Sequence, residues 1–244
     1  MTEPSPNAEL LQSLGRLVRG LSALFWGLPI ALIVCFNTGR ADWLKSFGMV
    51  PPLVVTGWLL YGLWQLEHFQ KQERVWRRAL DRAKIFGLLN VGLSPFLYWS
   101  NKMPAHPFFE PMLTLLMVSG LLFLNNFNLV LQRLSAMLPD ETLRSETRHF
   151  TTLNCGLLLA TAALLISYHA LVYFHSLPLG VAVLLEQLER HNQWWEIVLK
   201  LSPLALLVLL PLAMTMALLW KIKETILDSV LDRKSTRLNS SHRL

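Results

Sequence analysis

Long apolar runs separated by short polar stretches dominate the pattern of this chain. Six of these runs predict transmembrane helices, over residues 21–38, 50–66, 85–101, 111–131, 151–174 and 201–220. Each is close to the roughly 17–25 residues that a helix needs to cross the hydrocarbon core of a bilayer. The pattern therefore predicts an all-α, polytopic membrane protein with about six transmembrane helices.

Two polar stretches also show helical periodicity, with apolar side chains gathered on one face. Residues 8–20 place Leu10, Leu14 and Leu17 together, and residues 179–199 place Leu184 and Leu188 opposite acidic side chains. A helix with one apolar and one charged face is typical of segments that lie in the membrane surface. We therefore expect interfacial amphipathic helices beside the spans.

The distribution of Lys and Arg predicts the orientation of the spans. One set of connections and ends holds 13 of these residues: Arg16, Arg19, Lys71, Arg74, Arg77, Arg78, Arg82, Lys84, Arg133, Arg144, Arg148, Lys221 and Lys223. The other set holds five: Arg40, Lys45, Lys102, Arg190 and Lys200. Because basic loops stay in the cytoplasm, the N-terminus and the end of the sixth span are predicted to be cytoplasmic, in a cell (inner) membrane. Tryptophans then fall at both interfaces, with Trp43, Trp99, Trp194 and Trp195 outside and Trp64, Trp76 and Trp220 inside.

The connection 69–84 has no Gly or Pro and is predicted to be helical. Its Trp76, Leu80 and Ala83 share a face that we expect to rest on the inner leaflet, while the basic residues of Lys71–Lys84 meet anionic lipid head groups. The alternative interpretation is a solvated, charged linker.

Composition agrees with a membrane protein, and the last residues of the chain account for part of its net positive charge. Hydrophobic residues make up 53% and charged residues 16% of the chain, against about 25% charged in soluble domains. Residues Asp232–His242 match the translation of a common sequencing adapter, so we expect 232–244 not to be native. Without this tail the net charge falls from +6 to +3, because four basic residues and Asp232 are removed, and nucleic acid is not an expected partner. The expected organisation is a cytoplasmic segment (1–20), a transmembrane domain (21–220) and the start of a cytoplasmic helix (221–231) that the tail cuts short.

Polar side chains inside the predicted spans are the candidate functional residues, because polar groups are costly in hydrocarbon unless they are bonded. With the orientation above, several fall in the cytoplasmic half or at its mouth: Glu67, His68, Asn90, Asn125, Asn126, Asn128, Thr151 and Asn154. They could converge on a polar cavity that opens to the cytoplasm. The alternative interpretation is that they form hydrogen bonds between helices and hold the bundle together.

Recognisable chemical motifs are missing from the sequence. It has no phosphate-binding Gly-rich loop, HExxH, paired CxxC or GxSxG, so we expect no metal or cofactor. Three functions remain open. The first, which the sequence slightly favours, is a transporter or channel-like protein, or a subunit of one, for a polar solute. The second is a structural or assembly partner in a membrane complex or homo-oligomer. A membrane enzyme acting on lipid through Glu67, His68 or His169 is the least favoured.

Overall fold

The computed structural model describes residues 6–40, 44–67, 69, 73–104, 106–138, 140–173 and 209–228. In this part of the chain every regular element is helical, as predicted. The elements are α1 (Pro6–Arg40), the 3₁₀ turn η1 (Lys45–Phe47), α2 (Val50–Glu67), α3 (Arg74–Leu93), α4 (Pro95–Lys102), α5 (Phe109–Ala136) and α6 (Glu141–Tyr173). A further helix covers 209–228.

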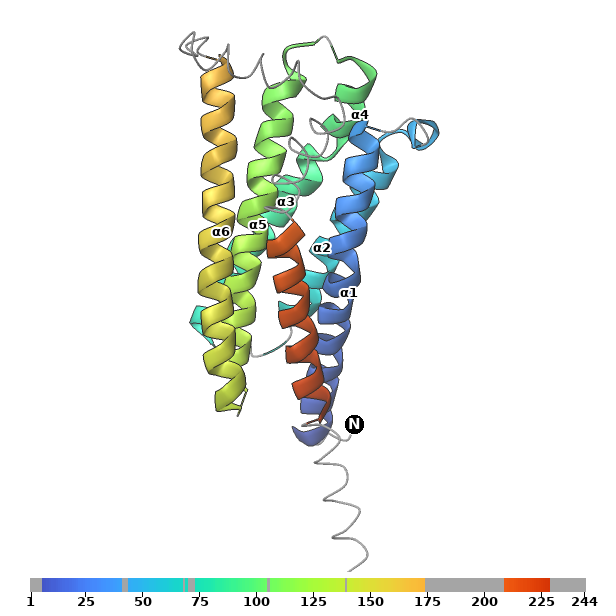
Figure 1. Ribbon diagram of the computed structural model, residues 1–244. Coiled ribbons are helices and arrows are strands. Elements are labelled where there is room, and N and C mark those ends of the chain that lie inside the picture. Colours follow the sequence, from blue (N-terminus) through green and yellow to red (C-terminus); the bar gives the residue numbers. More distant parts are fainter. Residues whose placement is uncertain are drawn as a thin grey trace, which may run out of the picture.

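The helices stand side by side and alternate in direction along the bundle (Figure 1). The main neighbours are α1 with α2, α2 with α3, α3 with α5, and α5 with α6. The 209–228 helix lies against the bundle between α1 and the α5–α6 pair (Figure 1). A continuous core of leucine and aromatic side chains joins these helices, including Leu63, Phe127, Leu131 and Leu219, each at most 1% exposed.

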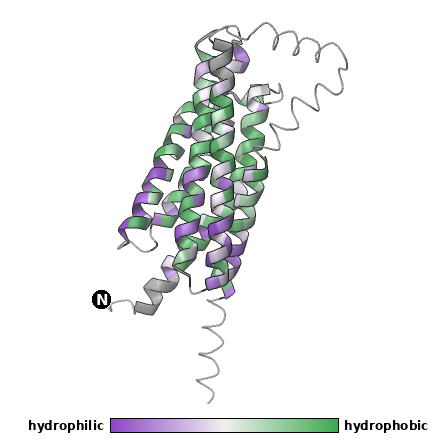
Figure 2. Cartoon of the chain, turned by 60° about the vertical axis from the view of Figure 1, so that its left-hand side comes forward, coloured by the Kyte–Doolittle hydropathy of each residue, from purple (hydrophilic) through white to green (hydrophobic). Residues whose placement is uncertain are grey.

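Within the described ranges, three helices are long and apolar enough to cross a membrane: Gln12–Gly39 within α1, Phe109–Ala136, which is α5, and Glu141–Ser167 within α6. The 35 residues of α1 and the 33 of α6 are each about 50 Å long, whereas the hydrocarbon core is about 30 Å thick. The bundle is therefore longer than the membrane core. Hydrophilic residues concentrate toward one end of the bundle, which we call the charged end (Figure 2).

At the charged end, the two segments that were expected to lie on the membrane surface are instead part of the bundle. Residues 8–20 form no separate surface helix, because α1 runs unbroken from Pro6 and buries Leu17 completely. Trp76, Leu80 and Ala83 do not rest on a leaflet either, since each is at most 1% exposed. The physical reason is that α3 stands upright in the bundle, so its apolar face meets other helices. The amphipathic stretch 179–199 lies outside the described residues.

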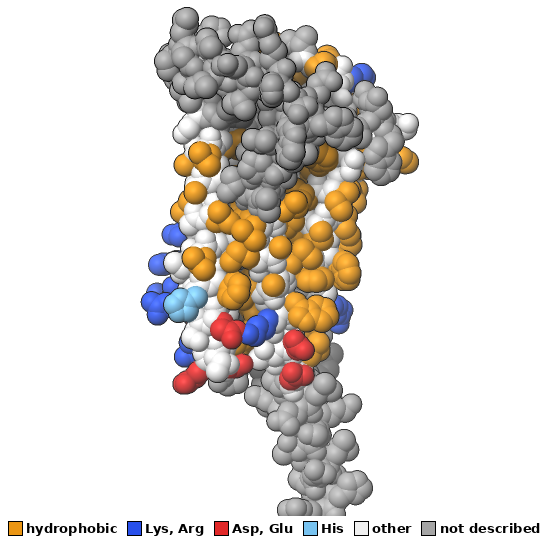
Figure 3. Space-filling model, viewed as in Figure 1, with side chains coloured by type: hydrophobic (Ala, Val, Ile, Leu, Met, Phe, Trp, Pro, Cys, Tyr) orange, Lys and Arg blue, Asp and Glu red, His pale blue; other side chains and the backbone are white. Residues whose placement is uncertain are grey.

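Exposed aromatic residues still mark part of the predicted inner belt. Trp64 and Trp220 are 55% and 54% exposed, and Trp26 joins them at 59%. Charged side chains gather below the exposed apolar surface of this face (Figure 3). The belt therefore keeps two of its three predicted inner tryptophans and loses Trp76 to the core.

Local chemistry explains where the helices break. Pro95 cannot donate a hydrogen bond to the carbonyl of Val91, and the Ser94 hydroxyl donates to that oxygen instead, at 2.9 Å. This bond satisfies the carbonyl at the junction of α3 and α4. At the start of α6, Asp140 Oδ1 accepts from the backbone N–H groups of Thr142 and Leu143 at 3.0 and 3.2 Å. The sequence Leu138-Pro139-Asp140-Glu141 predicts a helix start here, with Asp140 as the cap, and these bonds confirm it.

The hydrogen bonds at the α6 cap also make Asp140 sensitive to pH. The Thr142 hydroxyl and the backbone N–H groups bond its carboxylate and lower the pKa of Asp140. A lowered folded-state pKa means that this cap stabilises the protein above the ordinary carboxyl pKa and is lost as the pH falls through the folded value.

Candidate functional site

Thr215 is the centre of a buried polar cluster that joins three helices. Its hydroxyl oxygen accepts hydrogen bonds from Asn128 Nδ2 on α5 and from Asn154 Nδ2 on α6, both at 3.0 Å. Asn154 Nδ2 also donates to the carbonyl of Pro211, at 3.1 Å. The three polar side chains are at most 2% exposed. We call Asn128, Asn154, Thr215 and the Pro211 carbonyl the Thr215 cluster.

The donors of the Thr215 cluster are fully used. Asn128 Nδ2 gives its second hydrogen to the carbonyl of Leu124, at 2.8 Å. The Thr215 hydroxyl has one hydrogen, which reaches either the Pro211 carbonyl at 2.7 Å or Asn128 Oδ1 at 3.2 Å. A side-chain amide has two donor hydrogens, so neither asparagine has one left for a ligand. The arrangement fits a role in tying helices together.

Asn90 is buried in a different place from the Thr215 cluster. Ser119 on α5 donates a hydrogen bond to Asn90 Oδ1 on α3, which joins these two helices. Ser119 and Asn128 are nine residues apart on α5, which at about 100° and 1.5 Å per residue puts them on opposite faces and about 13 Å apart along the axis. The expected convergence of Asn90 with Asn128 and Asn154 is therefore not seen.

The remaining predicted residues are dispersed. Asn126 is partly exposed and donates to the carbonyl of Leu122 on its own helix, at 2.7 Å. Glu67 at the end of α2 pairs with Lys84 Nζ at 2.6 Å, so its carboxylate contacts α3. His68, which would complete a Glu67–His68 pair, lies outside the described residues, as does the side chain of His169.

Some buried oxygens have no hydrogen-bond partner within the described ranges. They include Asn125 Oδ1 on α5 and Thr147 Oγ1, Thr151 Oγ1 and Asn154 Oδ1 on α6. The three α6 residues share one helical face because they are spaced by four and three residues. Unbonded buried polar atoms are uncommon in native proteins and call for an explanation. Of the predicted residues, Thr151 and Asn154 on this face of α6 and Asn125 on α5 therefore have an unbonded oxygen among the described residues.

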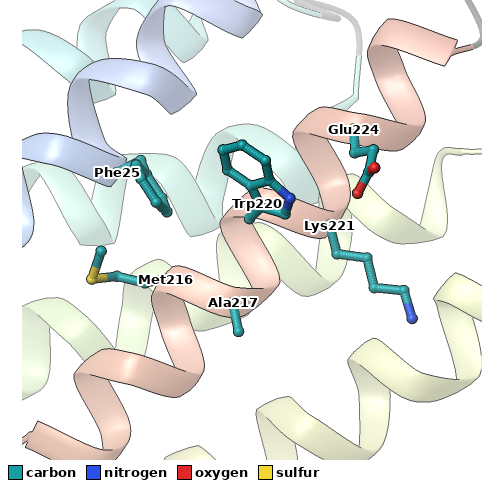
Figure 4. Close-up of a pocket in the computed structure, with 6 residues that line it drawn as sticks. All are labelled: Phe25, Met216, Ala217, Trp220, Lys221 and Glu224. Atoms are coloured by element: carbon teal, nitrogen blue, oxygen red, sulfur yellow. The ribbon is translucent and has the colours of Figure 1, made fainter.

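Two of the surface hollows on the described part of the chain have none of the predicted polar residues in their lining. Phe25 of α1 and Met216, Ala217, Trp220, Lys221 and Glu224 of the 209–228 helix line the larger one (Figure 4). Phe25 and Trp220 face each other with ring centroids 5.8 Å apart. Lys221 extends away from Phe25 and pairs with Glu146 on α6. This hollow is a shallow, mostly apolar depression on the outer surface.

Thr215 was not among the predicted site residues, although a signal for it was present. It is the one polar side chain between Leu204 and Leu219, in an otherwise apolar run. An isolated polar residue at that depth needs a partner, and the available partners are the asparagines of other spans. The sequence does not say which asparagines these are.

Comparison with known proteins finds no family model that matches the chain, no similar curated protein and no similar solved structure. Function must therefore be argued from the arrangement of the chain's own residues.

Proposed function

We propose that this chain is a six-span inner-membrane protein that serves as a structural or assembly partner in a membrane complex. The observation that carries the proposal is the Thr215 cluster, in which side chains from three helices are joined by hydrogen bonds and all their donor hydrogens are used. Hydrogen bonds between spans hold helices in fixed positions, at about 0.6–2 kcal/mol per contact. A bundle whose helices are fixed by hydrogen bonds, and whose outer faces are exposed, suits a protein that binds other subunits of a complex.

A complex of more than one chain is the expected form in native membranes. After mild detergent extraction, blue-native electrophoresis and light scattering should give a protein mass above that of one chain. A strictly monomeric protein under several mild detergents would contradict the assembly role.

A transporter or channel-like function for a polar solute is the second candidate. The unbonded oxygens of Thr147, Thr151 and Asn154 favour it, because a polar solute or water would bond such atoms.

The basic surface of α3, with Arg74, Arg78 and Arg82 exposed, suits anionic lipid head groups under either function.

Thiol labelling separates the two candidates. In a background lacking Cys35 and Cys155, a Thr151→Cys variant should remain unmodified by a charged, water-soluble thiol reagent, because Thr151 is 2% exposed. Ser145→Cys, on the same helix and exposed, should react rapidly and serves as the matched control. Rapid modification of Thr151→Cys would instead support a water-filled path and the transport function.

The same background tests the orientation. The connection between α4 and α5 lies at the opposite end of the bundle from the start of α6 (Figure 1). His106 belongs to that connection and Glu141 is the first residue of α6, and both side chains are exposed. With an impermeant maleimide on intact spheroplasts, His106→Cys should be labelled, whereas Glu141→Cys and Glu224→Cys should be labelled only after permeabilisation. The reverse pattern would invert the proposed topology, and opposite sides for Glu141 and Glu224 would contradict the six-span count.

A further inference from the structure

The second hollow lies between α4 and α5, at the end of the bundle opposite the charged end. It has a volume of about 300 Å³ and is lined by Ser100, Pro104, His106, Phe109, Glu110, Leu113, Thr114 and Met117. Four of these residues, Glu110, Leu113, Thr114 and Met117, follow one face of α5 at helical spacing. The hollow therefore runs along the first two turns of that helix.

The lining changes from polar to apolar along this path. Glu110 lies in the first turn of α5 beside the connection that holds His106, and we call this end of the hollow the rim. Leu113 and Met117 lie about one and two turns farther along α5. Glu110 and Met117 are seven residues apart, or about 10 Å along the helix axis. Met117 and the neighbouring Leu115 are 51% and 49% exposed, so this part of the surface faces lipid in an embedded protein. The shape suits an amphiphile with a polar head at the rim and a chain beside Met117.

The carboxylate of Glu110 at the rim favours a ligand with a positively charged head group. Glu110 is the carboxylate among the described lining residues, and no Lys or Arg is among them. The nearby cation, Lys102, lies over the rings of Tyr98 and Trp99, at 5.8 and 5.5 Å from their centroids. Ser100 and Lys102 are two residues apart on α4, so they point to opposite faces of that helix. Among the described lining residues, an ammonium group at the rim would meet one negative charge and no Lys or Arg.

An aromatic cluster adds a second contact for a cation. Phe109 lines the hollow, and its ring packs against Phe108 and Phe96, with centroids 5.8 and 6.3 Å away. His106 contacts the same ring at 5.3 Å. Aromatic faces attract ammonium groups, and a ring held on several sides is already in place to do so.

We propose that this hollow binds a phospholipid with a primary ammonium head group, with the ammonium at Glu110 and an acyl chain beside Leu113 and Met117. This lipid site goes beyond the structural role proposed above. The observation that carries it is the coincidence of one carboxylate, a fixed aromatic ring and an apolar floor in one hollow at the membrane boundary.

Native mass spectrometry of the full chain tests the proposal. The protein is released from mixed micelles that contain equal amounts of phosphatidylethanolamine and phosphatidylglycerol with identical acyl chains, and the two lipids retained are counted. The wild type should retain the ethanolamine lipid in about two- to fivefold preference, the range expected for one exposed ion pair. Glu110→Gln should bring this preference close to one.

Two further variants make the result specific. Glu141→Gln removes an exposed first-turn glutamate from α6 and should leave the preference unchanged. Met117→Trp fills the apolar part of the hollow and should reduce retention of both lipids. The proposal is overturned if Glu110→Gln keeps the wild-type ratio, if Glu141→Gln changes it equally, or if the wild type shows no preference.

Discussion

A Gly20→Ala variant should be markedly less stable than the wild type, because α1 and α2 cross at this residue. A Cβ atom at Gly20 would lie 2.9 Å from the Gly62 carbonyl oxygen and 2.9 Å from Gln65 Cβ. The Gly62 oxygen belongs to the backbone of α2, so the helices themselves would have to separate. Overpacking of this kind costs about 1–3 kcal/mol, and the better helix propensity of alanine offsets only roughly 1 kcal/mol of it.

Gly15→Ala provides the matched control for this prediction. Gly15 lies on the same helix, five residues earlier, and a Cβ there would have nothing within 4 Å. The control should be neutral or more stable by up to about 1 kcal/mol, because only helix propensity changes. Thermal unfolding in detergent should thus rank Gly15→Ala, wild type and Gly20→Ala in falling order. Equal melting temperatures for the two variants would show that the crossing is looser than described.

Asn154→Leu should also destabilise the protein, by about 1–3 kcal/mol. The substitution removes two hydrogen bonds to the 209–228 helix, one to the Pro211 carbonyl and one to the Thr215 hydroxyl. Interhelical bonds in membranes average about 0.6 kcal/mol and reach about 1.7. Because the lost contacts hold the 209–228 helix against α6, limited proteolysis should cut that helix sooner in the variant.

Asn126→Leu on α5 tests whether the cost comes from the ties between helices. Asn126 bonds to its own helix and is partly exposed, so its loss should change stability by less than about 0.5 kcal/mol. A double-mutant cycle between Asn154→Leu and Thr215→Val should show coupling, because the two residues share a bond. Additive effects in that cycle would mean that the Thr215 cluster does not act as a unit.

The asparagines of α5 show which part of the candidate site could be predicted from the sequence. Several polar groups in one apolar run need hydrogen-bond partners, which is why the sequence identifies them as candidates. Asn125, Asn126 and Asn128 nevertheless meet different surroundings: an unbonded buried oxygen, a bond within the helix and a bond across to Thr215. Successive residues are about 100° apart, so a small rotation of α5 would exchange these roles. That rotation depends on every contact that α5 makes.

The basic segment 69–84 shows the same limit of sequence-based prediction. Its amphipathic pattern was correctly read as helical, since the period of apolar residues is local information. The surface that covers its apolar face was read incorrectly, because a leaflet and a neighbouring helix present the same chemistry to Trp76 and Leu80. Burial at 1% for both residues identifies the covering surface as protein.

The sequence by itself determined that the chain is helical, that Asp140 begins a helix, and that α1, α5 and α6 are apolar over a membrane-spanning length. These properties depend on residue periodicity and on side chains acting within one turn. The tertiary structure decided that Gly20 and Gly62 form the α1–α2 crossing, that Ser119 is the partner of Asn90, and that Thr215 joins Asn128 to Asn154. Those pairings link residues as many as 87 positions apart. They depend on how the helices rotate and cross, which only the packing of the whole bundle determines.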